Sequence, residues 1–334
     1  MAEQVAVAPL VKPVSRRSRG ASDTPESEWG KARERLAWLL VAPSILVVAI
    51  VALYPLFQTF RLSFTNQKLA SSDPWRYLGF EQYQYLLSND GFQRAFRNTV
   101  VFTFSSVVLE TLLGIVVALI INSNFRGRGL MRTSILIPWA IPTVVSARLW
   151  EYMYHGNYGV INDLLVRKLP QLVDWIPGIG GTLASIFPEN NIAFTARPNY
   201  AMPAMVMVDV WKTTPFMALL ILAGLQIIPG DVYEASFIDG ATKIQQFFQM
   251  TLPLLKPALL VALIFRTLDA FRVFDVIYVM RGVAVETQTL AIFSQQTLVN
   301  EDRLGQTSAA SVIIFLCIGA MVLIYTRLVK VEEA

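Results

Sequence analysis

Six apolar stretches, each long enough to cross a lipid bilayer, constrain this chain of 334 residues more than any other feature. A transmembrane helix needs about 20 consecutive, mainly apolar residues to span the hydrocarbon core. The stretches cover residues 36–58, 99–122, 133–153, 203–227, 254–279 and 308–328. Over the whole chain 54% of the residues are hydrophobic and 16% are charged, whereas soluble domains average about 45–50% and about 25%. We therefore predict an all-α integral membrane protein with six transmembrane helices.

The composition disfavours several kinds of site. One cysteine, Cys317, and one histidine, His155, are too few for a disulfide framework or a cysteine- or histidine-based metal centre. The sequence contains no G-x-x-x-x-G-K-[ST] phosphate loop, no H-E-x-x-H and no G-x-S-x-G. We expect neither an enzyme nor ATP binding through a phosphate loop.

Basic residues predict the orientation. The polar segment 1–35, which we expect to be disordered, carries seven Lys and Arg, and the loop 123–132 carries three Arg and no acid. Short loops rich in Lys and Arg usually lie on the cytoplasmic side of the membrane, next to anionic lipid. The segment 1–35 and the loop 123–132 are therefore predicted to be cytoplasmic, and an even number of spans predicts the same for the C-terminus. The loop 154–202 is then external and the loop 229–253 cytoplasmic. A nucleic-acid-binding arm would also be basic, but the membrane explains the tail better, and no nucleic-acid partner is expected.

The cytoplasmic loop between the fourth and fifth spans is charged and broken by glycine. Asp231 and Glu234 have the spacing of a capping box, as have Thr242 and Gln245, and Gly240 lies between the two pairs. The pattern predicts two short helices joined at a sharp bend, because glycine readily adopts positive φ.

The same loop carries a family resemblance. We expect Leu252-Pro253 to end the second of these two helices. The stretch 234–253 reads EASFIDGATKIQQFFQMTLP. It resembles the EAA motif, EAAxxDGAxxxxxFxxIxLP, of bacterial ABC-importer permeases, with Ser236 and Met250 as mild departures. The stretches 135–163 and 270–280 resemble the third-span and fifth-span regions of carbohydrate-type permeases. The loop 281–290, RGVAVETQTL, departs from the Gly-Gly-Pro-containing loop that the family often has there.

The resemblance implies a type I ABC importer in the bacterial inner membrane, with residues 36–330 as the permease domain. The partners implied are a second homologous permease subunit, two cytoplasmic ATPase subunits and an external solute-binding (lipo)protein. ATP and Mg would be bound by the ATPases, so this chain would hold no cofactor. The loop would be the coupling segment that docks on an ATPase, through Glu234, Ala235, Ser236, Asp239, Gly240 and Ala241.

Charged and aromatic residues within the spans are candidates for a sugar pathway, because intramembrane charges usually face a bundle interior or a cavity. Asp209 and Lys212 are three residues apart and could pair. The candidate set is Trp150, Asp209, Trp211, Lys212, Arg266, Asp269, Phe271, Arg272 and Asp275, with Glu110 and Arg148 as weaker members. The alternative is that the charges form structural ion pairs only.

The resemblance thus implies the permease subunit of an ATP-driven sugar importer, and it suggests a disaccharide such as trehalose or maltose as the substrate. An ion-coupled secondary sugar carrier is the alternative, and uptake that survives ATP depletion but collapses with an uncoupler would favour it.

Overall fold

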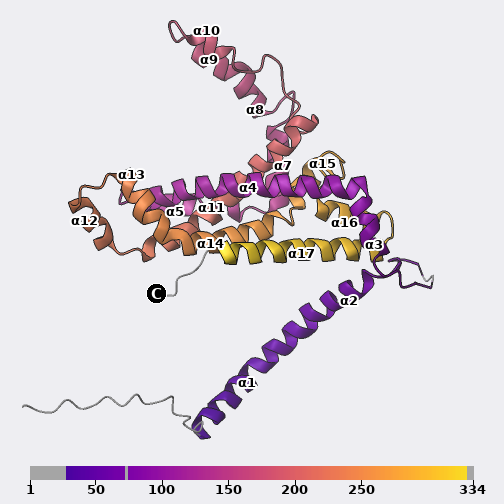
Figure 1. Ribbon diagram of the computed structural model, residues 1–334. Helices are drawn as coiled ribbons and strands as arrows, with labels where there is room; N and C mark the ends of the chain where they lie inside the picture. Colours follow the sequence, from indigo (N-terminus) through magenta and orange to yellow (C-terminus); the bar gives the residue numbers. More distant parts are fainter. Residues whose placement is uncertain (1–27, 72–73, 329–334) are drawn as a thin grey trace, which may run out of the picture. The chain divides into compact units, whose positions relative to one another are not determined.

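The computed structural model describes residues 28–71 and 74–328, and helices dominate it (Figure 1). Within this described part, five helical segments are long and apolar enough to cross a membrane: Arg33–Leu62, Asp90–Asn122, Pro198–Ile227, Lys243–Arg281 and Leu304–Arg327. A sixth is obtained if the pair Arg128–Ala140 and Thr143–Met153, bent by 90°, is counted as one span. The all-α membrane class is confirmed. The tail 1–27 and residues 329–334 lie outside the described residues.

The chain divides into two units, one up to Phe57 and one from Gln58 onward. The described part of the first unit is α1 (Glu28–Val48), the π-helical turn η1 (Ala49–Leu53) and the beginning of α2 (Tyr54–Leu62). Apolar side chains such as Leu39 and Val51 are exposed along it. A helix that faces lipid is expected to carry such a surface.

Four long helices form the centre of the second unit. They are α4 (Asp90–Asn122), α11 (Pro198–Ile227), α14 (Leu252–Ala270) and α17 (Leu304–Leu328). The α4 helix packs along α11, and α14 packs against α4, α11 and α17 (Figure 1). A Cβ atom added at Gly224 would lie 2.3 Å from Ala258 Cβ, so only glycine allows α11 and α14 to approach this closely.

Shorter helices lie at opposite ends of this bundle (Figure 1). At one end are α5 (Arg128–Ser134), α12 (Gly230–Ile238) and α13 (Lys243–Gln246). At the other end are α3 (Glu81–Ser88), α15 (Asp275–Arg281) and α16 (Leu290–Val299). The basic loop 123–132 and the segment 229–253 are therefore at the same end, as two loops on one side of a membrane must be.

The third predicted span is broken. The structure has α6 (Ile137–Ala140) and α7 (Thr143–Met153), with Ile141 extended between them at ψ 133°. A residue before proline is disfavoured in the helical region, so Pro142 ends one helix and starts the next in a new direction. The α6 helix packs against α11, and α7 packs against α15.

The predicted external loop 154–202 contains helical segments of its own: α8 (Val160–Asn162), η2 (Asp163–Lys168), α9 (Leu169–Asp174) and α10 (Gly180–Ala184). The buried Asn162 side chain bridges it, since it donates to Ile192 O at 2.9 Å and accepts from Ile192 N at 2.8 Å. At its start, burial raises the pKa of Tyr154 to about 12, so the phenol stays neutral.

Each of the three π-helical turns is followed by a proline on the second residue after it. The pairs are η1 with Pro55, η2 with Pro170, and η3 (Phe247–Thr251) with Pro253. Proline inside a helix clashes with the carbonyl group four residues earlier, and a widened turn relieves that clash. Our expectation that Leu252-Pro253 ends a helix was wrong for this reason, because the helix runs without a break from Lys243 past Pro253.

Candidate functional site

An ionic cluster is buried where α4, α11 and α14 meet. Arg266 of α14 is its centre, and its guanidinium group donates to Glu110 of α4 (Nη2 to Oε1, 2.9 Å) and also contacts Asp209 of α11. A further bond reaches Asp269 Oδ2 on its own helix at 2.7 Å. The side chains of Glu110 and Arg266 are only 0% and 2% exposed. Arginine suits this place because its planar fork of donors can serve several carboxylates at once.

Two hydroxyl groups complete the cluster. Thr213 Oγ1 donates to Glu110 Oε1 at 2.6 Å. Ser106 Oγ lies 3.1 Å from Glu110 Oε1 and also contacts Asp209 Oδ2, and it can donate its single proton to only one of them at a time. These hydroxyl groups provide hydrogen-bond partners for the carboxylates of Glu110 and Asp209, whose burial would otherwise be costly.

The spacing of Asp209 and Lys212 allows an ion pair between them, but in the structure each side chain has another partner. Asp209 is paired with Arg266 instead, and Lys212 Nζ donates to the backbone carbonyl of Trp139 in α6 at 3.3 Å. With two cations and two carboxylates buried, the charges of Glu110, Asp209, Lys212 and Arg266 sum to zero. A neutral sum is the arrangement that a low-dielectric interior tolerates best.

A cavity of about 200 Å³ lies beside this cluster. It brings together six residues of the candidate set, which come from α11, α14 and the turn into α15: Asp209, Lys212, Arg266, Asp269, Arg272 and Asp275. Within that group, Asp269, Arg272 and Asp275 are exposed, whereas the others are buried. The first three therefore have polar atoms available to a bound molecule, whereas Asp209 and Arg266 bond to each other and Lys212 bonds to the carbonyl of Trp139.

The three aromatic candidates do not line this cavity. Trp150 and Trp211 pack edge to face on each other, with ring centroids 5.5 Å apart. Phe271 is 3% exposed and packs in a core cluster with Leu86 and Leu290. Arg148, a weaker candidate, forms an exposed pair with its helical neighbour Glu151 at 2.6 Å.

Sequence reasoning gave too little weight to Glu110 and omitted Ser106 and Thr213. The signal was present as spacing, since Ser106 and Glu110 are four residues apart, as are Asp209 and Thr213, and residues four apart share a helix face. A pair of polar residues on one face of each of two apolar helices indicates a polar contact between those helices.

The bend between α12 and α13 has a defined hydrogen-bond pattern. Ala241 N donates to Ser236 O and Gly240 N donates to Phe237 O, both at 3.0 Å. These two bonds form a Schellman motif, which requires a left-handed residue at the position of Gly240; its φ is 80°. The predicted bend at this glycine is present.

The two predicted capping boxes had different outcomes. Thr242 and Gln245 form one, with Gln245 N donating to Thr242 Oγ1 at 3.3 Å and Thr242 N to Gln245 Oε1 at 2.8 Å. The box at Asp231 was wrong, because α12 already begins at Gly230 and Pro229 is its N-cap residue. The ring of Pro229 fixes φ at a value compatible with a helix start, so the first turn of α12 begins at Gly230, before Asp231.

The motif residues divide by exposure. Glu234, Ala235, Asp239 and Gly240 are exposed and Ala241 is partly buried. Ser236 is 1% exposed, and its hydroxyl accepts a bond from Gln246 Nε2 at 2.8 Å, so it fastens α12 to α13 rather than presenting itself for docking.

Large apolar side chains surround the exposed motif residues. Phe237, Ile238, Ile244 and Phe248 are between 61% and 83% exposed. Exposed apolar side chains gathered in this way mark a protein or membrane interaction site.

The helical bundle, its intramembrane ionic cluster and its exposed apolar loop are those of a multi-pass membrane permease. Residues 110–331 match the family described as the inner membrane component of binding-protein-dependent transport systems. The chain belongs to this family and is a permease subunit of an ABC importer, not an enzyme. An ion-coupled secondary carrier, our alternative, is thereby set aside.

Two relatives are similar over most of their length. The trehalose/maltose transport system permease protein of Thermococcus litoralis is 41% identical over 302 residues, which cover 89% of this chain and 95% of that protein. The trehalose transport system permease protein of Mycobacterium tuberculosis is 35% identical over 297 residues, covering 89% of each.

A solved structure shares the fold. A chain in the crystal structure of a bacterial ABC transporter involved in the import of the acidic polysaccharide alginate has a TM-score of 0.73 at 23% identity. The match covers 92% of this chain and 99% of that one.

Proposed function

We propose that this chain is the permease subunit of a disaccharide importer, with trehalose or maltose as the substrate. The observation that carries the proposal is the 41% identity, over nearly the whole of both chains, to a trehalose/maltose permease protein. A second trehalose permease protein at 35% identity supports the same substrate class.

The assembly follows from the family. One chain provides half of a pathway, so a second homologous permease is its partner, and an external solute-binding protein delivers the sugar. Two cytoplasmic ATPase subunits hold the ATP and Mg. A relative of the same fold was solved in complex with a ligand-bound periplasmic protein, which supports the external partner. The predicted inner-membrane orientation, with both termini cytoplasmic, puts α12 and α13 on the ATPase side.

The continuous helix from α13 into α14 is the proposed mechanical link. It runs unbroken through η3 from Lys243 to beyond Arg266, a length of roughly 35 Å at 1.5 Å per residue. Closure of the ATPases would move the apolar surface of Phe237, Ile238, Ile244 and Phe248, and the helix would carry that movement to the ionic cluster. Because the cluster joins three helices, they would move as one body during alternating access.

The exposed members of the cavity are the proposed sugar contacts. Asp269, Arg272 and Asp275 can each offer hydrogen bonds to hydroxyl groups, because they are exposed at the cavity. Glu110, Asp209 and Arg266 are assigned a structural role, since their polar atoms already bond to one another.

Growth of a deletion strain tests the proposal. Cells that lack the chain should fail to grow on trehalose or maltose and should still grow on glucose, and the wild-type chain should restore growth. Glu234→Lys should not restore it, although the protein inserts in the membrane, whereas the matched change Glu189→Lys in the loop after α10 should. Normal growth of the deletion strain on both disaccharides would refute the proposed substrate class.

A further inference from the structure

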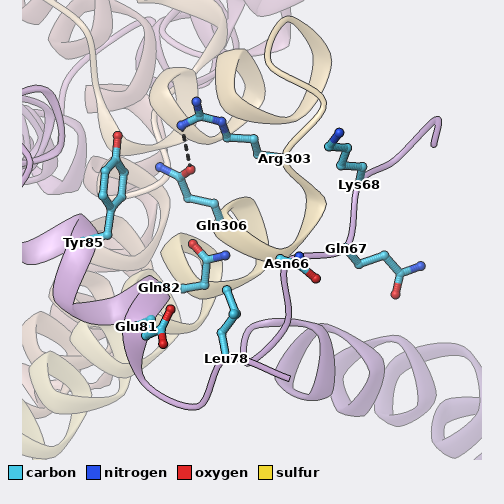
Figure 2. Close-up of a pocket in the computed structure, with 9 residues that line it drawn as sticks. All are labelled: Asn66, Gln67, Lys68, Leu78, Glu81, Gln82, Tyr85, Arg303 and Gln306. Carbon is cyan, nitrogen blue, oxygen red and sulfur yellow. Dashed lines mark hydrogen bonds between the residues drawn. The ribbon is translucent and has the colours of Figure 1, made fainter. Parts of the chain in front are cut away.

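A second polar pocket lies at the other end of the bundle, away from the ionic cluster. It measures about 400 Å³ and is lined by residues of three segments: the loop between α2 and α3, helix α3, and the start of α17 (Figure 2). Glu81, Gln82 and Tyr85 come from α3, Gln306 comes from the first turn of α17, and Arg303 directly precedes that helix. Neither the coupling segment nor the intramembrane cavity shares a residue with it.

The pocket is held in shape by hydrogen bonds between its segments. Gly305 N donates to Gln67 O at 2.9 Å, and Ala70 N donates to Asp302 Oδ1 at 2.7 Å. A Cβ atom added at Gly305 would lie 2.0 Å from Thr65 O, so the loop rests directly on the backbone of α17. Residues 65–70 of the loop are therefore a fixed wall of the pocket.

Several polar groups of the lining point into the pocket with bonding capacity to spare. Gln306 is only 5% exposed, and Arg303 Nη1 donates to its Oε1 at 3.2 Å, as the dashed line in Figure 2 shows. Within the described part of the chain, neither Gln306 Nε2 nor the Glu81 carboxylate has a hydrogen-bond partner. Both groups are therefore able to form hydrogen bonds with a molecule in the pocket.

The mixture of donors and acceptors defines the ligand chemistry. Arg303 and the amide of Gln306 donate, whereas Glu81 accepts, and hydroxyl groups can satisfy both because each donates and accepts. The lining holds the cations Lys68 and Arg303, the carboxylate of Glu81 and four amide side chains, whereas an apolar molecule would find few apolar partners besides Leu78 and the ring of Tyr85. An uncharged polyhydroxyl ligand fits this lining best.

We propose that this pocket is a second carbohydrate site, which holds one pyranose ring of the substrate on the external side before it enters the membrane pathway. The inference rests on the proposed function for both the sugar and the external orientation of this end. The three segments that build the pocket would then act as a receiving surface distinct from the cavity at Asp269.

The test uses the complete transporter, with the partner permease and the ATPases, in lipid nanodiscs without the solute-binding protein. The dissociation constants of trehalose and maltose are measured by calorimetry for the wild type, Gln306→Ala and Glu81→Gln. Gln84→Ala is the matched control, because Gln84 is exposed on the same helix α3 and does not line the pocket. We expect about tenfold weaker binding for the two pocket variants, since each loses a hydrogen bond to the sugar, and no change for the control.

Transport by the same variants separates the possible failures. If the wild type takes up sugar and both pocket variants bind sugar as tightly as the wild type does, the second site is overturned and the proposed function stands. Loss of ATPase stimulation by sugar-free solute-binding protein in the pocket variants would also overturn it, because the pocket would then be a protein-docking surface. Absence of uptake of either sugar by the wild type would overturn the proposed function, and the site with it.

Discussion

At the scale of single residues, the contacts of Arg266 decide how three helices of the bundle are joined. Its guanidinium group contacts a carboxylate on α4, another on α11 and a third on its own helix. Replacement of one partner of a buried ion pair leaves the other charge unpaired in a low-dielectric surrounding, which costs about 3–5 kcal/mol.

Arg266→Gln should therefore lower the free energy of unfolding by about 3–5 kcal/mol, because Glu110 and Asp209 lose their cation. Thermal unfolding of the purified protein in detergent measures this. Arg272→Gln is the matched control, since Arg272 is exposed nearby and should change stability by less than about 0.5 kcal/mol. Equal destabilisation by both changes would contradict the role given to Arg266.

The sequence identified the charged residues of the cavity but not their partners. The charges at Asp209, Lys212 and Arg266 stand out in apolar stretches, and a span with charges predicts a polar interior. Which charges pair depends on how three helices are rotated against one another, and spacing within one helix says nothing about that. The structure pairs Asp209 with Arg266 instead of Lys212, and it has Phe271 in a core cluster that does not line this cavity.

At the scale of elements, the bend between α12 and α13 is specified by local chemistry. The Schellman motif at Gly240 and the capping box at Thr242 each use residues within a few positions of one another. Local signals of this kind can be read from a sequence. The π-helical turns could not be, because proline is as compatible with a helix end as with a widened turn.

Gly240→Ala should reduce coupling between ATP hydrolysis and transport. A residue with a side chain at φ 80° costs about 1–2 kcal/mol in the left-handed region, so the bend would relax and shift the exposed apolar surface. We expect a lower ratio of sugar transported to ATP hydrolysed in proteoliposomes. Gly129→Ala is the control, since Gly129 lies in α5 with open space around the position of its Cβ atom. An unchanged ratio for Gly240→Ala would contradict a role of this bend in coupling.

At the scale of the whole molecule, the hydrophobic pattern alone predicts the membrane fold. Five of the six expected spans overlap long helices of the described residues, although the helices at Asp90–Asn122 and Lys243–Arg281 begin 9 and 11 residues before the expected starts at 99 and 254. The third differs, because paired prolines allow either a kinked span or two separate helices, and tertiary contacts of α6 with α11 and of α7 with α15 decide between them.

The predicted orientation can be measured with cysteine labelling. Cys317 is the one cysteine of the chain, so Cys317→Ala provides a cysteine-free background. In intact spheroplasts, a membrane-impermeant maleimide should label Gln84→Cys and should not label Ile238→Cys until the membrane is opened. Labelling of Ile238→Cys from outside would reverse the orientation and remove the coupling segment from the ATPases.

In the proposed function, ATP hydrolysis by partner subunits drives sugar transport through this chain. The most direct measurement is uptake of labelled trehalose and maltose into proteoliposomes that contain this chain, its partner permease, the ATPases and the solute-binding protein. We predict uptake that requires ATP inside, continues in the presence of an uncoupler and stops with Glu234→Lys. Uptake without ATP that an uncoupler abolishes would contradict the account.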